Sequence, residues 1–170
     1  MINTREGRSE QDSRKRPLVI SLQPEASQMP ASGNREIPFE RAILTIRNVS
    51  DAELADVVLR ATLGQEGGTV QDISDSLARS VPASIPPLGS VRWDLYDLLL
   101  TAHPGAASKL HMFGYRAALN WRFDLVCRAE YRLPDSAAPE QTPESRWTLR
   151  WTVPDASRGD VVLEIEAIIA

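Results

Sequence analysis

Apolar and polar side chains alternate along residues 121–133, and this run constrains the fold more than any other stretch. A β-strand points successive side chains to opposite faces, whereas a helix needs apolar residues three and four positions apart. The run therefore predicts a strand with its odd-numbered side in the core and charged residues on the other side. The predicted core residues are Trp121, Phe123, Leu125, Cys127, Ala129, Tyr131 and Leu133.

A second alternating run follows at residues 146–153, where Trp147, Leu149, Trp151 and Val153 share one side. Residues 134–145 lie between the two runs and are rich in Pro, Ser, Ala and Glu, a composition typical of a loop. The two runs are predicted to form an antiparallel hairpin with a long connection. Pairing in phase would bury both apolar sets together, and a slip of one residue would turn them to water.

The rest of the chain predicts one all-β domain. Twelve prolines and nine glycines in 170 residues argue against a helical bundle. We expect a single antiparallel β-sandwich of about 7–8 strands over residues 17–170, with one or two short helical turns. Residues 1–16 are polar and carry five basic side chains, which predicts a disordered basic arm. Further strands are expected at 18–22, 41–49, 57–63, 91–95 and 161–169, a polar loop at 23–36, a hairpin joining 41–49 to 57–63, and helical turns within 72–81 and 94–102.

Two segments carry a family resemblance. The phrase "LTIRNVSDAELADVVLRATL" at residues 44–63, followed by "IPPLGSVRW" at 85–93, resembles bacterial immunoglobulin-like sandwich domains of the cell-adhesion-related type. Those domains pair a strand ending in Asn with a polar turn and a Val-rich strand, then use a Pro-Gly turn before the next strand. The resemblance implies an immunoglobulin-like fold. It does not imply adhesion or an extracellular address, because the first 16 residues contain no apolar segment typical of a secretion signal.

Cysteine content and hydropathy predict a cytoplasmic setting. Cys127 is the single cysteine, so no intrachain disulfide can form, as expected in a reducing compartment. Its place on the apolar side of the 121–133 run predicts a buried, unreactive thiol. No window approaches the ~20 apolar residues of a membrane span.

Residues typical of catalysis are scattered, so we expect neither an enzyme nor a cofactor or metal site. His103 and His111 lie eight residues apart, with no second His or Cys cluster to complete a zinc site. Asp124 and Glu130 lie roughly 20 Å apart on a strand, too far for a glycosidase pair. No nucleotide-binding or nucleophile-elbow motif occurs.

The outward face of the predicted hairpin is the candidate binding surface. Arginine outnumbers lysine 17 to 2, and guanidinium groups bind carboxylates and phosphates and are enriched at interfaces. We expect a non-catalytic protein-interaction or assembly module with a protein partner or a homo-oligomer, docking by this face, by edge strands or by the basic arm. The alternative for the face is a solvated surface of weak ion pairs. The candidate partner-binding residues are Arg122, Arg128, Arg132, Arg146 and Arg150.

Two other functions stay open from the sequence. One is a ligand-binding sandwich for carbohydrate or nucleic acid, which requires Trp93, Trp147 or Trp151 to be exposed. The net charge of −4 gives no reason to favour nucleic acid. The other is a structural subunit of a larger particle.

Overall fold

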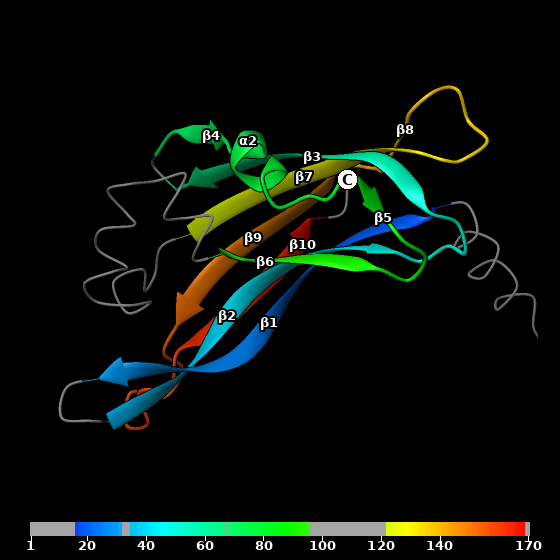
Figure 1. Cartoon of the computed structure of the whole chain (residues 1–170). Coiled ribbons are helices and arrows are strands. Elements are labelled where there is room, and N and C mark those ends of the chain that lie inside the picture. Colours follow the sequence, from blue (N-terminus) through cyan, green and yellow to red (C-terminus); the bar gives the residue numbers. More distant parts are fainter. Residues whose placement is uncertain (1–15, 32–34, 67, 96–121, 169–170) are drawn as a thin grey trace, which may run out of the picture.

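Two antiparallel β-sheets pack against each other in the computed structural model, which describes residues 16–31, 35–66, 68–95 and 122–168 (Figure 1). The predicted all-β sandwich is confirmed. The three-stranded sheet has the order β1-β2-β6, and the seven-stranded sheet has the order β10-β9-β7-β3-β4, with β5 pairing with β3 and β8 with β7. The elements are β1 Leu18–Ala31, β2 Arg35–Asn48, β3 Leu54–Gln65, β4 Val70–Asp72, α2 Ser74–Ala78, β5 Ser84–Ile85, β6 Ser90–Asp94, β7 Arg122–Arg132, β8 Glu140–Gln141, β9 Ser145–Thr152 and β10 Val162–Ile168.

Strand β7 lies in the middle of the larger sheet and has the predicted orientation. Its odd-numbered side chains from Phe123 to Tyr131 are all buried. It pairs with β9 in phase, with Phe123 opposite Leu149 and Leu125 opposite Trp147. The predicted antiparallel hairpin is therefore confirmed. Several predicted features lie outside the described residues. They are most of the predicted arm (1–15), the predicted helical turn and connection from residue 96 to Trp121, and Ile169 of the last run.

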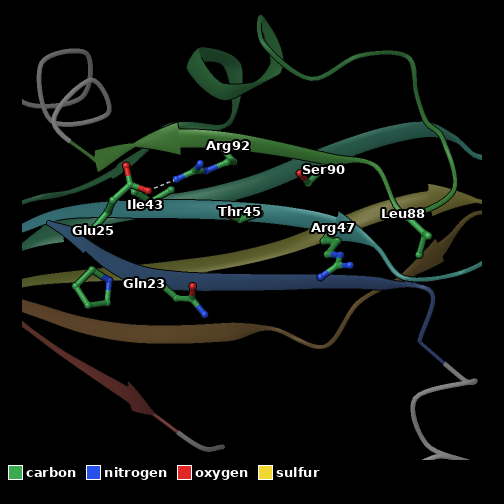
Figure 2. A pocket seen from close by; sticks show the side chains of 9 residues that line it. Gln23, Glu25, Ile43, Thr45, Arg47, Leu88, Ser90 and Arg92 are labelled. Atoms are coloured by element: carbon green, nitrogen blue, oxygen red, sulfur yellow. Dashed lines mark hydrogen bonds and ion pairs between the residues drawn. The ribbon is translucent and has the colours of Figure 1, made fainter. Parts of the chain in front are cut away.

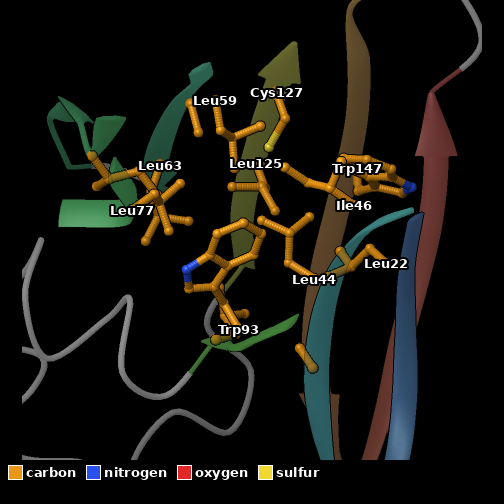
Figure 3. Packing of buried hydrophobic residues seen from close by; sticks show 14 of the residues in the cluster. Leu22, Leu44, Ile46, Leu59, Leu63, Leu77, Trp93, Leu125, Cys127 and Trp147 are labelled. Atoms are coloured by element: carbon orange, nitrogen blue, oxygen red, sulfur yellow. The ribbon is translucent and has the colours of Figure 1, made fainter. Parts of the chain in front are cut away.

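The core lies between the two sheets. Side chains from β1, β2, β3, β6, β7, β9 and α2 meet in one apolar cluster, part of which Figure 3 shows. The Phe123 and Trp151 rings pack edge to face with centroids 5.9 Å apart, an arrangement that the aromatic quadrupole favours. Trp93 and Trp147 are 8% exposed and Trp151 is fully buried. The three tryptophans are core residues, as their alternation predicts.

The predicted polar loop over residues 23–36 is wrong. Strand β1 continues to Ala31 and pairs with β2 along its whole length, from Leu18 opposite Asn48 to Ala31 opposite Arg35. Pro24 and Pro30 suggested a loop, but β1 is an edge strand of its sheet, and proline is tolerated there because an amide on the open side needs no ladder partner. The result is a long hairpin that extends past the rest of the three-stranded sheet (Figure 1).

The predicted hairpin between 41–49 and 57–63 is also wrong. Both segments are strands, β2 and β3, but they belong to different sheets. The turn after Asn48 carries the chain across the sandwich, so that Ala42, Leu44 and Ile46 face Leu59 and Leu63 across the core. Alternation identifies the buried side of each strand. It does not identify the hydrogen-bonded neighbour, because two facing strands of opposite sheets have the same pattern as two paired ones.

The segment from β4 to β6 contains a short helix, α2. Ile73 and Leu77 anchor α2 in the core, which decides the ambiguity of residues 72–81 in favour of a short helix. The Ser74 hydroxyl accepts a hydrogen bond from the Ala61 amide at 3.0 Å and so ties α2 to β3. The Pro-rich turn then leads into β6, as predicted.

The two sheets are joined by hydrogen bonds between the first half of β2 and the start of β10. Val161 and Phe39 form an isolated parallel bridge. The Val161 amide donates to the Pro38 carbonyl and the Glu40 amide donates to the Val161 carbonyl, each at 3.0 Å. The Glu40 carboxylate accepts the Leu163 amide at 2.8 Å, and the Trp151 indole donates to the Glu40 carbonyl at 2.9 Å. Residues 38–40 thus fasten the edge of the larger sheet.

Candidate functional site

The five predicted partner-binding arginines lie on the outward face of the seven-stranded sheet, and each is exposed. Strand β9 places Arg150 directly opposite Arg122 and places Arg146 opposite Val126. Arg128 and Arg132 lie further along β7, beside β3. The structure therefore distributes the five residues along one face and does not gather them into one cluster.

Arg122, Arg132 and Arg146 each lie beside a carboxylate. Arg122 Nε lies 3.6 Å from Asp124, Arg132 Nε lies 3.3 Å from Asp56, and Arg146 lies 2.6 Å from Glu144. Thr148 links Arg122 to Asp124 as well, since its hydroxyl donates to the carboxylate at 2.9 Å and accepts from the guanidinium at 3.3 Å. All of these pairs are about half exposed, so each contributes under ~1 kcal/mol.

Arg128 lies directly opposite a sixth arginine, Arg60 of β3. Both side chains are exposed, and within the described residues neither has a carboxylate within ion-pair distance, although Arg60 is near enough to Asp72 to help lower the pKa of that carboxyl group. Like charges in a direct cross-strand pair repel each other. Sequence reasoning missed Arg60, although its position between Leu59 and Ala61 in an alternating run already placed it on an outward face. What the sequence lacked was the pairing of β3 with β7.

A shallow depression of about 320 Å³ lies beside these arginines at the β9–β10 edge of the sheet. Arg122, Arg150, Glu164 and Glu166 line it, with Thr148 and Ile165 between them. Glu164 is opposite Arg150 and Glu166 is opposite Thr148. Positive and negative side chains alternate on this part of the face, so it is not a uniformly basic surface.

The outward face of the smaller sheet has a depression of similar size, about 330 Å³ (Figure 2). An ion pair between Glu25 of β1 and Arg92 of β6 reaches across β2 and leaves Ile43 beneath it only 8% exposed. Leu88 projects at one end; the residue is 67% exposed and has a positive φ of 59°, which is rare for a bulky residue. One ion pair, between Glu25 and Arg92, therefore lies within this depression.

The groups considered for chemistry in the described part of the chain are one cysteine and the carboxylates. Cys127 is buried, and burial raises the pKa of its thiol to about 12, so it is not a nucleophile near neutral pH. No cluster of three His, Cys, Asp or Glu side chains occurs in this part of the chain. His103 and His111 lie outside it.

The pKa values of two carboxylates are lowered by their neighbours. Asp72 accepts hydrogen bonds from the hydroxyl and the backbone amide of Ser74, and the hydroxyl bond has the larger effect in lowering its pKa. Asp155 accepts the same two bonds from Ser157, with the same effect on its pKa. Each pair stabilises a turn in the chain, at the start of α2 and between β9 and β10. Both carboxylates therefore serve as hydrogen-bond acceptors within their own turns.

Comparison with known proteins gives no family. No protein-family model matches this chain. A search of curated proteins finds no match either. Among solved structures, a crystal structure of a protein from Archaeoglobus fulgidus aligns over 88% of this chain and 98% of that one, at 10% identity and a TM-score of 0.24. A TM-score of that size does not establish a shared fold.

None of the described helices has the length and apolar content needed to cross a membrane.

Proposed function

We propose that this protein is a non-catalytic interaction or assembly module that docks a protein partner or a second copy through the outward face of the seven-stranded sheet. The observation that carries the proposal is the direct pairing of Arg60 with Arg128, both exposed and without an ion pair among the described residues. A carboxylate from a partner can bridge two neighbouring guanidinium groups and remove their repulsion. The partner surface at this point is therefore acidic.

The order of the strands supports an immunoglobulin-like scaffold for this module. Immunoglobulin-like domains place strands A, B and E in one sheet and strands C, F and G in the other, with C′ beside C. Here β1, β2 and β6 occupy the places of A, B and E, and β4, β3, β7 and β9 those of C′, C, F and G, with β10 added at the end. The single, buried, free Cys127 supports a cytoplasmic setting as part of the same proposal.

A ligand-binding sandwich with an exposed tryptophan platform has no such support. Trp93, Trp147 and Trp151 are all buried. The arginines of the sheet face are interspersed with carboxylates, which weakens a phosphate-backbone interaction that depends on net positive charge.

The test is charge reversal at Arg128. Arg128→Glu puts a carboxylate opposite Arg60, where the new pair contributes up to ~1 kcal/mol, so the melting temperature is expected to stay the same or rise slightly. Binding to an acidic partner is expected to fall at least tenfold. Solution mass by light scattering and quantitative pull-down from the native cell provide the readouts.

Arg47→Glu is the matched control, because it changes the net charge equally at an exposed site on the other sheet. The proposal is supported when a self-association or a co-purifying protein is lost with Arg128→Glu and kept with Arg47→Glu. It is overturned when the two variants behave alike, or when the wild-type protein is a monomer without any co-purifying protein.

A further inference from the structure

The open edge of β10 carries main-chain groups that no described residue binds. The Val161 and Leu163 amides both point away from β9, because they donate to Pro38 and Glu40 of β2. Amide direction alternates along a strand, so the amides and carbonyls of Ile165 and Ala167 point to the same side. Beyond Leu163 this edge has no strand partner within the described part of the chain.

The side chains along this edge differ between its two sides. Ile165 is half-buried on the core side, and Ala167 on the same side is exposed. Glu164 and Glu166 are exposed on the outward side, and Ile168 is 46% exposed. A strand added here would find apolar neighbours on one of its faces and carboxylates on the other.

The glutamates disfavour a second β10 paired along the whole edge. A two-fold antiparallel pairing centred on Ile165 places Glu164 of each copy opposite Glu166 of the other, and like charges in direct cross-strand pairs are destabilising. Basic side chains at the same positions would instead form cross-strand ion pairs. The charges therefore select a basic strand.

Residues 38–40 already show how an extended segment sits on this edge. They form the parallel bridge to Val161 and then leave the edge, with the Glu40 carboxylate taking the Leu163 amide in place of a main-chain carbonyl. The free part of the edge starts immediately after this contact. Strand addition by another protein would continue a geometry that the fold itself uses.

We propose that the β10 edge from Leu163 to Ile168 binds an extended segment of a partner protein in which basic and apolar side chains alternate. The main-chain groups of β10 provide the hydrogen bonds, Ile165 and Ala167 contact the apolar side chains, and Glu164 and Glu166 pair with the basic ones. This surface is separate from the Arg60–Arg128 pair and takes a partner of the opposite charge, so it extends the proposed function and does not depend on it.

The probe is a fluorescein-labelled, end-blocked heptapeptide of alternating lysine and valine, and binding is followed by fluorescence anisotropy on the full-length protein. We expect saturable binding, and at least tenfold weaker binding of the same peptide with glutamate in place of lysine. Hydrogen exchange supplies a local readout, because the Ile165 and Ala167 amides should become protected when the lysine peptide binds.

Two protein variants test the contacts separately. Ala167→Pro removes an outward amide and leaves the β9–β10 ladder intact, so it should weaken binding about tenfold, whereas Ala167→Val keeps the amide and should bind like the wild type. The double variant Glu164→Lys, Glu166→Lys should reverse the preference and favour the glutamate peptide. Circular dichroism verifies that each variant is folded.

The inference is overturned if the lysine peptide does not bind, if both peptides bind equally, or if the double variant keeps its preference for the lysine peptide. Because Arg128→Glu leaves β10 intact, it should bind the lysine peptide like the wild type. Failure at this edge and failure at the arginine face are therefore distinguishable.

Discussion

Asn48 is fully buried and joins three parts of the chain. Its side-chain amide donates to the carbonyls of Ala52, Ile85 and Pro86 at 2.7, 3.0 and 3.1 Å. Its carbonyl oxygen accepts the Ser50 amide at 3.0 Å and the Ser50 hydroxyl at 2.7 Å. The side chain therefore fixes the crossing from one sheet to the other against the turn that begins β6. The sequence marks it only as a turn residue, because its partners at 85 and 86 come from the fold.

Substitution of Asn48 should destabilise the protein strongly. Asn48→Ala leaves several buried polar groups without partners, and we expect a loss of about 2–4 kcal/mol in the free energy of unfolding. Asn48→Asp should cost more, because a carboxylate would face the three carbonyl oxygens. Urea unfolding at neutral pH measures both. Ser50→Ala, which removes a single hydroxyl of the same turn, is the control, and a loss as large as that of Asn48→Ala would contradict the role assigned to the asparagine.

At the scale of single elements, alternation predicts the strands that lie in the body of the sandwich. The inward side of β7 and its register with β9 follow from the sequence, because a one-residue slip would expose every large side chain. The length of β1 cannot be predicted from the sequence, because prolines such as Pro24 and Pro30 are common both in loops and in edge strands. The Arg60–Arg128 pair was equally out of reach, because it depends on which strands are neighbours.

Two residues of β7 should make the stability of the protein fall at alkaline pH. Burial raises the pKa of Cys127 to about 12, and burial together with the Glu140 carboxylate, to which the Tyr131 hydroxyl donates, raises the pKa of Tyr131 to about 12. Both groups are held neutral in the folded protein and ionise more easily in the unfolded chain. Their contribution to stability is complete below the unfolded pKa values and is lost as the pH rises from about 9 towards 12.

The expected result is a fall in the urea midpoint between pH 9 and 12 that is shallower in Cys127→Ala and in Tyr131→Phe. Chemical denaturation at a series of pH values measures it. An identical pH dependence in the wild type and in both variants would show that neither group is linked to folding in this range.

For the molecule as a whole, the sequence predicts the all-β sandwich but not how its strands are divided between sheets. The apolar faces of β2 and β3 have similar patterns, and only the assembled core shows that they belong to opposite layers. One cluster of buried side chains connects both sheets and α2. Neither sheet has a separate core of its own among the described residues.

A shared core predicts a single cooperative unfolding transition. Leu44→Ala in the smaller sheet and Leu125→Ala in the larger one should each lower the free energy of unfolding by about 2–5 kcal/mol, since both side chains are fully buried. In each variant, tryptophan fluorescence and far-ultraviolet circular dichroism should report the same midpoint. Two separated transitions, with one variant shifting only one of them, would contradict a common core.

The fastening of residues 38–40 onto β10 has a consequence for biosynthesis. Glu40 leaves the ribosome 123 residues before its partner Leu163. At roughly 5–20 residues per second, this interval lasts on the order of ten seconds. Throughout that time the sheet that covers the apolar side of the β1–β2 hairpin is incomplete, because its edge strand β10 has not yet been made, and a nascent chain of this protein leaves part of its core open to solvent and to chaperones that shield exposed strands.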